Sequence, residues 1–306
     1  MDAGGRVTSG TVTEERPRRK LLLKVAGRVK RAQKERNHHV KLMTFMLTYP
    51  DINPIAVQLG PLKVRWYGIS YVIGILVGWW LLRKRATVYS WTNEQVADIV
   101  FYATIGIIVG GRLGSVLFYN LPYYLSHPAE IINITQGGMS FHGGLIGALI
   151  ASWYFGRSTG KGFFGVIDFV APVVPVGLFC GRIGNFINGE LWGAPSSLPW
   201  AMIFPDPRAG GIPRHPSQLY EAMLEGVVLF IILWVYSAKP RPAMAVSGLF
   251  LLGYGVFRFG IEFIREPDAN IGYLAFDWVT MGQALSFPMI VAGAVMLYFA
   301  YRPKKT

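Results

Sequence analysis

The sequence has 306 residues, of which 52% are hydrophobic and only 15% are charged, and its mean hydropathy is +0.36. Soluble globular domains carry about 25% charged residues, so this composition excludes an ordinary soluble domain and indicates a polytopic membrane protein. The single cysteine, Cys180, excludes an internal disulfide and a cysteine-rich metal site. Because Cys180 lies in an apolar run, we predict a thiol that only packs.

The basic residues are concentrated at the N-terminus. The formal net charge is +13, but residues 1–42 contain twelve Lys or Arg against four Asp or Glu and so supply +8 of it. Lys24 interrupts the apolar patch of this segment, which is too short for a signal-peptide core. We expect no nucleic-acid partner. We interpret residues 1–42 as a dispensable arm, either the result of an upstream start codon or a segment that binds anionic lipid.

Seven apolar stretches follow, each near the roughly 17 to 25 residues that a membrane helix needs. The predicted fold class is therefore all-α, a polytopic membrane protein with about seven transmembrane helices, a small outer-face cap at residues 184–217, and one seven-span domain over residues 43–306. The predicted spans are Tyr67–Leu82, Val96–Tyr119, Phe141–Phe155, Phe164–Ile183, Leu219–Tyr236, Val246–Ile264 and Met281–Tyr301.

The charge of the connecting segments predicts the orientation. Connecting segments with basic residues alternate with segments that carry no Lys or Arg. The basic ones contain Arg83–Arg85, Arg157 with Lys161, and Lys239 with Arg241, and the others are residues 120–140 and 266–280. By the positive-inside rule the C-terminus is cytoplasmic, and seven spans then place the segment before Tyr67 outside. Twelve basic residues in the first 42 would be difficult to translocate. This conflict is a second reason to expect that the working protein begins near Met43.

The most unusual stretch is Gly181–Gly193, GRIGNFINGELWG, which directly follows the apolar run Phe169–Cys180. We interpret it as a polar loop at the end of a membrane helix. A glycine-rich loop allows backbone N–H groups to approach an anion, and Arg182 adds a charged donor fork suited to phosphate. The alternative is a helix end with a well-hydrogen-bonded turn.

This stretch resembles a signature of the prolipoprotein diacylglyceryl transferases, bacterial inner-membrane enzymes. Four further blocks share the resemblance, in the same order, and together the blocks span nearly everything from Met43 to the C-terminus. They are RWYGISY at Arg65–Tyr71, GGMSFHGGLIG at Gly137–Gly147, RHPSQLYEAMLEG at Arg214–Gly226 and GYGVFRFGIEFIREPD at Gly253–Asp268.

The resemblance implies a reaction. Diacylglycerol moves from phosphatidylglycerol to the lipobox cysteine of a prolipoprotein signal peptide within the bilayer, giving a thioether and glycerol 1-phosphate. Bidentate donors that bind the departing phosphate more strongly as its charge develops would lower the barrier, and the family resemblance assigns this role to Arg182 and Arg258. The scheme needs no cofactor and no metal.

Charged residues in or beside the spans must find partners, because each costs about 2.5 to 3.5 kcal/mol at the centre of a membrane helix. Arg258 and Glu262 are four residues apart, so a purely structural ion pair is the alternative to phosphate binding. Glu221 and Glu225 share this spacing with like charge, which implies partners on other helices or a protonated member. The full set is Arg112, Asp168, Arg182, Glu221, Glu225, Arg258 and Glu262.

The precursor thiol has an ordinary pKa near 8.5, so it needs activation. His142 matches the histidine proposed as the base in the family, although a histidine at an interface is often only a hydrogen-bonded anchor, and activation by the arginines is the competing explanation. His215 is a weaker candidate, because Pro216 suggests a structural turn. His38, His39 and His127 lie outside the matched blocks.

Five more residues match family positions tied to activity and are predicted to contact the lipid head group or to hold the arginines. For Tyr67, an aromatic belt at the membrane interface is the alternative. For Glu190 we expect pairing with an arginine rather than proton transfer. The five are Tyr67, Asn185, Glu190, Gly193 and Tyr254.

Two other classes of protein fit parts of the pattern. A lipid or organic-anion transporter would also place arginines in membrane spans, and a scaffold protein would need only their pairing. The charges gather toward one face rather than at the midplane, which disfavours transport, and a scaffold would not need so elaborate a glycine-asparagine segment.

Overall fold

The computed structural model describes residues 47–50, 52–60, 62–133, 137–267 and 272–303. The basic segment 1–42 lies outside the described residues, and so does the predicted start near Met43.

The described residues form seven helical rods, which confirms the predicted helical membrane fold. Four of the rods are both long and apolar enough to cross a bilayer: α3, the rod from Phe163 to Ile187, the rod from Ser217 to Tyr236, and α11. The rods are α2 (Trp66–Arg85), α3 (Asn93–Phe118), α5 (Phe141–Ser158), α6 (Phe163–Val170) continued by η3 (Ala171–Val173) and α7 (Val174–Ile187), α8 (Ser217–Glu221) continued by the π-helix η5 (Ala222–Val228) and α9 (Leu229–Tyr236), α10 (Ala245–Ile261) and α11 (Met281–Tyr301).

One predicted boundary is wrong in a way that matters for the site. The fourth span was expected to end at Ile183, but α7 continues to Ile187, so Arg182 and Asn185 project from a helix rather than from a loop. Gly184 serves packing here, because a Cβ at this position would lie 2.8 Å from both the Tyr67 ring and the Ser70 hydroxyl on α2. The glycines that suggested a loop therefore bring two helices together.

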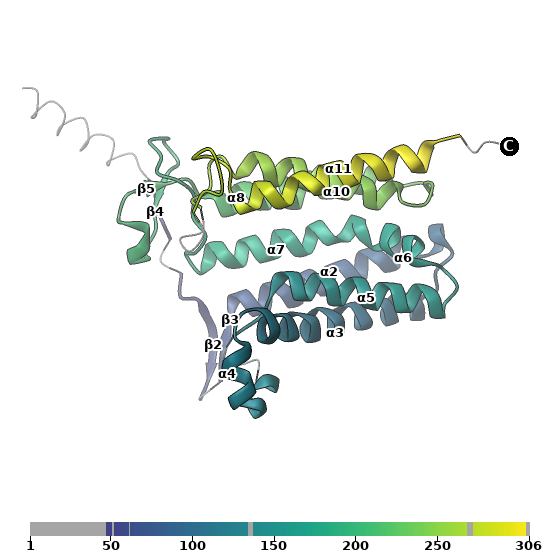
Figure 1. The fold of residues 1–306 in the computed structure, drawn as a ribbon, viewed down its shortest axis with the longest axis horizontal. Helices are drawn as coiled ribbons and strands as arrows, with labels where there is room; N and C mark the ends of the chain where they lie inside the picture. The colour runs from purple at the N-terminus through teal and green to yellow at the C-terminus, as the bar shows by residue number, and fades with distance from the viewer. Residues whose placement is uncertain (1–46, 51, 61, 134–136, 268–271, 304–306) are drawn as a thin grey trace, which may run out of the picture.

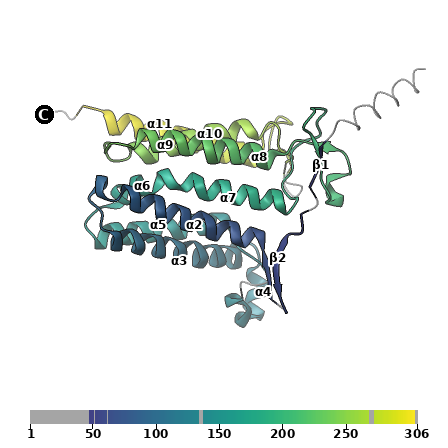
Figure 2. The same cartoon turned by 180° about the vertical axis from the view of Figure 1, so that it is seen from behind.

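The rods are arranged in two groups with α7 between them (Figures 1 and 2). Helices α2, α3 and α5 lie on one side, and α9, α10 and α11 lie on the other. Helices α3 and α5 approach so closely that a Cβ at Gly110 would collide with the backbone of Gly143 and Gly147. Small residues allow this backbone approach, which supplies van der Waals contact where the lipid provides no hydrophobic drive.

Short elements cover one end of the bundle, which we call the cap end. Strands β1 (Leu47–Thr48), β4 (Met202–Ile203) and β5 (Pro213–Arg214) form a sheet in the order β1-β4-β5, with β1 and β4 parallel and β4 and β5 antiparallel. The same end also carries η4 (Pro207–Ala209), the hairpin β2 (Ile55–Leu59) and β3 (Leu62–Arg65), α4 (Leu121–Ser126) and η2 (Pro128–Ile132). The predicted cap thus begins after Ile187 and also includes β1.

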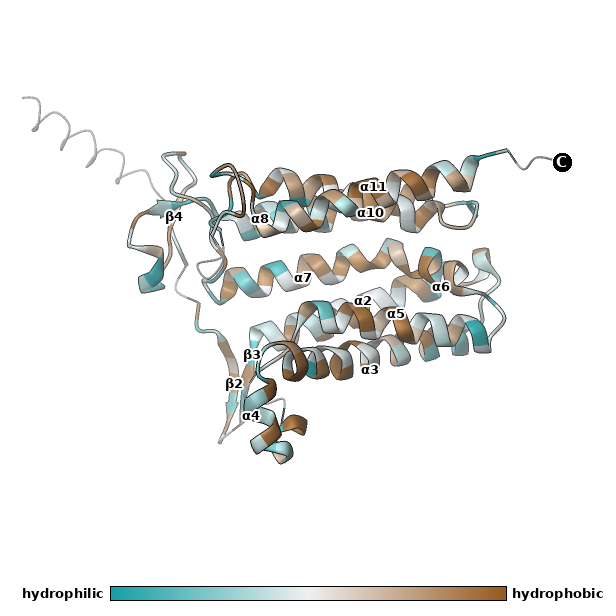
Figure 3. Ribbon diagram, viewed as in Figure 1, coloured by the Kyte–Doolittle hydropathy of each residue, from teal (hydrophilic) through white to brown (hydrophobic). Residues whose placement is uncertain are grey.

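The opposite end of the bundle carries most of the basic connections. Figure 1 shows the C-terminus at this end, together with the turns that follow α2 and α5. Arg83–Arg85 lie in the last turn of α2, before η1 (Thr87–Tyr89), and Arg157 lies in the last turn of α5. The rods between the two ends are dominated by apolar residues (Figure 3). This separation agrees with the alternation of charge seen in the sequence.

Candidate functional site

A cluster of arginines and glutamates lies between α7, α8, η5 and α10, toward the cap end. Arg182 on α7 places its Nε 2.6 Å from Glu221 Oε2 and its Nη2 3.4 Å from Glu225 Oε2. The Glu221 and Glu225 side chains are only 1% and 0% exposed. The sequence left two alternatives for Glu221 and Glu225, partners on other helices or a protonated member. The structure shows the first, because Arg182 lies on another helix.

Arg258 on α10 completes the contact between the helices. Its Nη1 lies 3.3 Å from Glu221 Oε2, and its Nη2 forms an ion pair with Glu262, one turn further along the chain. Arg265 extends the cluster, with its Nη1 3.2 Å from Glu262 Oε1, and the Thr280 hydroxyl donates a hydrogen bond to the other oxygen of Glu262. The predicted pair of Arg258 and Glu262 therefore exists, but it belongs to a larger network.

The network has balanced formal charge, with three arginines and three glutamates. Such balance allows six charged groups to remain within a membrane protein, where an unpaired charge would be costly. We refer to these residues as the ion network: Arg182, Glu221, Glu225, Arg258, Glu262 and Arg265.

The ion network is well paired in charge but poorly satisfied in hydrogen bonds. Among the described residues, Arg258 Nη1, both Glu221 carboxylate oxygens and Glu225 Oε1 are buried and contact opposite charges, but none of these contacts is aligned as a hydrogen bond. Buried polar groups nearly always have partners, and each one left without a partner costs about 1 to 3 kcal/mol. A ligand with phosphate oxygens and hydroxyl groups carries the acceptors and donors that this site needs.

The turn after α7 is organised by Glu190. The Glu190 carboxylate accepts hydrogen bonds of 3.0 Å from the side-chain amides of both Asn185 and Asn188. The Gln218 amide donates to the backbone carbonyl of Glu190. The sequence predicts an arginine beside Glu190; among the described residues its hydrogen-bond partners are two amides, and Arg208 is close enough to interact through its charge. The hydrogen bond from Asn185 fixes the position of this turn relative to the helix that carries Arg182.

Gly193 lies where two chain segments meet. Its N–H donates a 2.8 Å hydrogen bond to the His215 carbonyl, and it forms an antiparallel bridge with Arg265. A Cβ at Gly193 would lie 2.6 Å from the Ile264 carbonyl oxygen and 2.7 Å from the His215 Cβ. Only glycine fits this approach, so a packing role explains the residue without contact to substrate.

His215 is held in the turn before α8. Its Nδ1 lies 3.3 Å from the Tyr220 hydroxyl, which also accepts a 2.7 Å hydrogen bond from Trp200. Burial lowers the pKa of His215 below its ordinary value, so the imidazole is neutral at pH 7. The adjacent Arg214 anchors the same turn through a 2.8 Å ion pair with Glu266.

Two predicted tyrosines lie on helices next to the ion network. Tyr67, in the first turn of α2, packs against Gly184, and its hydroxyl is 3.0 Å from the Tyr71 hydroxyl. Tyr254 lies one turn before Arg258 on α10, and its ring stacks on Phe250. Both tyrosines therefore pack close to the helices that carry the two arginines.

Comparisons with known proteins identify the family of the chain. A family model described as prolipoprotein diacylglyceryl transferase matches residues 54–299. The chain belongs to the prolipoprotein diacylglyceryl transferase family. Relatives named phosphatidylglycerol–prolipoprotein diacylglyceryl transferase include one from Azotobacter vinelandii, 60% identical over 84% of this chain and 97% of that protein. Another, from Methylococcus capsulatus, is 63% identical over 84% of this chain and 98% of its own length.

The family resemblance suggested His142 as a base. Among the described residues, His142 makes no contact with the ion network. It occupies the first turn of α5, after the Ser140 cap, and its exposed ring contacts that of Phe141 with centroids 5.7 Å apart. Within the described part of the chain, no hydrogen bond or ion pair joins His142 to Arg182 or Arg258. Its side chain is exposed at the cap end.

Two of the charged residues predicted to lie in or beside membrane spans, Arg112 and Asp168, bind backbone groups. The Arg112 guanidinium donates to the carbonyls of Glu130, Ile131, Gly137 and Gly138, and so anchors the segment before α5. Asp168 accepts hydrogen bonds from the backbone N–H groups of Met244 and Ser247 and thereby caps α10. These two residues satisfy backbone groups rather than join the ion network.

Sequence reasoning missed Arg265 and Thr280 as members of the site. Arg265 lies in a matched block, but it follows the last apolar residue of its span and was not considered with the membrane charges. Its spacing of three from Glu262 was a usable signal. Thr280 carried no comparable signal, because its contact with Glu262 depends on how α11 begins beside α10.

Proposed function

We propose that this multi-pass membrane protein transfers the diacylglyceryl group from phosphatidylglycerol to the lipobox cysteine of prolipoproteins, the first step of bacterial lipoprotein maturation. The sulfur of the cysteine attacks the glyceryl carbon, and the bond from this carbon to the phosphate oxygen breaks. A thioether forms and glycerol 1-phosphate leaves with the electron pair of the broken bond. The family match and the names of the relatives support this reaction, and neither supports the transporter alternative.

The ion network is the observation that best explains how the protein would assist. In our proposal the head-group phosphate takes N–H donors of Arg182 and Arg258, while hydroxyls of the glycerol head group donate to Glu221 and Glu225. Among the described residues, several buried charged atoms of these side chains have ion-pair contacts but no aligned hydrogen bond, and such a ligand offers the missing donors and acceptors. As the phosphate gains charge, its attraction to the two guanidinium groups strengthens, which lowers the barrier.

Purified protein mixed with phosphatidylglycerol and a lipobox peptide tests this proposal. We expect a diacylglyceryl thioether on the peptide cysteine and an equal amount of glycerol 1-phosphate, both measured by mass spectrometry. A peptide with serine in place of the cysteine is the control and should give neither product. Absence of both products from folded protein with the cysteine peptide would refute the assignment.

His142 is our proposed base for the precursor thiol. His142→Asn should reduce turnover at pH 7, and the deficit should shrink as the pH approaches the ordinary thiol pKa of about 8.5, because the thiol then ionises without help. His127→Asn is the matched control, since His127 also lies at the cap end but stacks on Tyr123. A His142→Asn enzyme with the wild-type rate, or one depressed equally at every pH, would indicate a structural histidine.

We further propose that the protein lies in the bacterial inner membrane with the cap end outside and the C-terminus in the cytoplasm. A reporter fused after Lys305 should read cytoplasmic, and one inserted near Ser126, at the end of α4, should read periplasmic. The basic turns at the end opposite the cap support this orientation. The reverse pair of readings would place the ion network toward the cytoplasmic leaflet and would refute the proposed orientation.

A further inference from the structure

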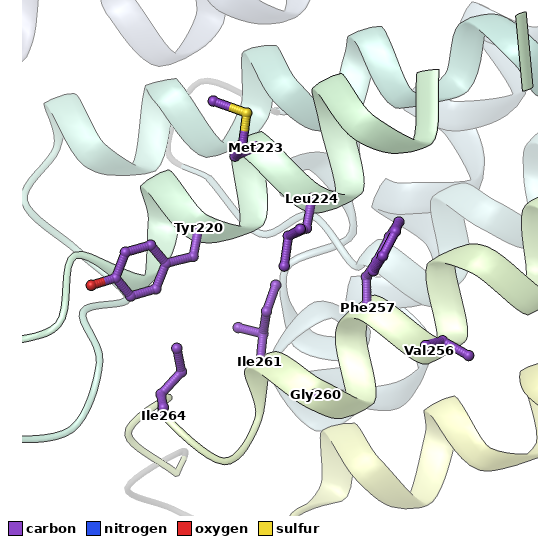
Figure 4. Close-up of a pocket in the computed structure, with 8 residues that line it drawn as sticks. All are labelled: Tyr220, Met223, Leu224, Val256, Phe257, Gly260, Ile261 and Ile264. Atoms are coloured by element: carbon purple, nitrogen blue, oxygen red, sulfur yellow. The ribbon is translucent and has the colours of Figure 1, made fainter. Parts of the chain in front are cut away.

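An apolar groove of about 360 Å³ lies between α8 with η5 and the last turns of α10. Figure 4 shows Leu224 and Ile261 directed toward one another across it, with Tyr220 and Ile264 at one end and Val256 at the other. The Tyr220 hydroxyl is already bonded to Trp200. The groove is therefore lined by hydrocarbon, and its volume falls in the range of ligand pockets, about 300 to 1,000 Å³.

The groove opens toward the surrounding bilayer. Met223 and Val256 at its rim are 54% and 49% exposed; Met223 lies on a rod long and apolar enough to cross a bilayer, and Val256 lies on the shorter apolar helix α10. A Cβ at Gly260 would meet no heavy atom of the described residues within 4 Å, so glycine at this position keeps the space open.

The same two helices carry the ion network on their other faces. Each of three residues that line the groove directly precedes a member of the ion network in the sequence. The pairs are Tyr220 with Glu221, Leu224 with Glu225, and Phe257 with Arg258. The end of the groove at Tyr220 and Ile264 lies toward the cap end, next to Arg265. A lipid whose phosphate binds Arg258 would therefore have its glycerol within about one helix diameter, 10 to 12 Å, of the groove.

We propose that this groove holds one acyl chain of the phospholipid substrate and thereby sets the position of the glyceryl carbon that reacts. The proposal rests on the transferase function proposed above. A lipid chain is favoured over the signal peptide as occupant, because the groove is lined by hydrocarbon and lies on the same two helices as the arginine that binds the head-group phosphate in our proposal.

In this proposal the groove sets the position of the bound lipid and contributes little to the affinity for it. An acyl chain that enters it leaves an equally apolar bilayer, so little hydrophobic free energy is gained. Its effect lies in alignment, since a misplacement of about 1 Å can reduce a rate about a hundredfold. The groove should therefore affect long-chain lipids and leave short-chain lipids unaffected.

Gly260→Leu directs a side chain into the groove from a position where a Cβ meets no heavy atom of the described residues within 4 Å. Val235→Phe is the matched control, because Val235 is 67% exposed on α9 and lies outside the groove. With dipalmitoyl phosphatidylglycerol, Gly260→Leu should lower kcat/KM at least tenfold, and with the dihexanoyl lipid it should change kcat/KM less than twofold. Val235→Phe should change neither. A Gly260→Leu enzyme that matches the control on both lipids, or that loses activity equally on both, overturns the proposal.

Occupancy can be measured without turnover. Phosphatidylglycerol with a photoactivatable diazirine in one acyl chain should crosslink wild-type protein in the peptides that contain Tyr220–Leu224 and Val256–Ile264. Gly260→Leu should lose these adducts, and Val235→Phe should keep them. Adducts spread evenly over the lipid-facing helices would contradict the groove, whereas a wild-type protein that crosslinks here but transfers from neither lipid would contradict the transferase function alone.

Discussion

Arg182→Lys is expected to reduce diacylglyceryl transfer by about a hundredfold or more while leaving the protein folded in the membrane. Lysine keeps the positive charge beside Glu221 and Glu225, so the balance of the ion network is preserved. It loses the planar fork that holds a phosphate through two parallel bonds. Loss of one such donor typically costs about 10² to 10³ in rate.

Arg182→Leu is the informative companion to this variant. Leucine leaves two buried carboxylates with one partner fewer, and removal of one member of a buried ion pair costs about 3 to 5 kcal/mol. We expect a clear fall in the thermal unfolding temperature in detergent for Arg182→Leu and almost none for Arg182→Lys. If Arg182→Lys retains nearly full transfer, charge alone suffices and the role of the fork is wrong.

The second large effect is expected at Arg258. Arg258→Leu should lower both stability and transfer, because it leaves the network with two arginines against three glutamates. The double variant with Glu262→Leu restores the balance, and replacing a buried pair by apolar residues is often neutral. We therefore expect the double variant to recover most of its thermal stability but to remain at least about a hundredfold slower than wild type.

Measuring transfer and unfolding on the same preparations separates the two roles of Arg258. A stable double variant that also transfers diacylglycerol would show that Arg258 only neutralises Glu262. Arg112→Leu is not a suitable control, because it would release the four carbonyls that anchor the segment before α5. Arg208→Leu is suitable, since this exposed arginine forms an ion pair with Asp206, two residues away in the cap.

The helical rods could be predicted from the sequence because a membrane imposes both the length and the apolar character of its helices. The end of α7 could not. Gly181, Gly184 and Asn185 looked like a loop in isolation, and only the approach of α2 to Gly184 explains why the helix continues to Ile187. Helix boundaries set by such packing are not encoded in local composition.

The ion network could be predicted in part. Charges in membrane spans require partners, so the pairing of Arg258 with Glu262 and the need of Glu221 for a partner elsewhere followed from spacing and cost alone. The amide partners of Glu190 did not, because hydrogen bonds within a turn depend on its backbone path. The apolar groove had no signal either, since it arises from the packing of two helices around Gly260.

Binding of the lipid head group tests the role of the ion network most directly. The thermal unfolding temperature of the purified protein is measured in detergent with and without glycerol 1-phosphate, for wild type, Arg182→Lys and His142→Asn. A ligand that binds only the folded state raises this temperature. We predict a rise for wild type and for His142→Asn and none for Arg182→Lys. An equal rise in all three proteins would contradict phosphate binding by Arg182.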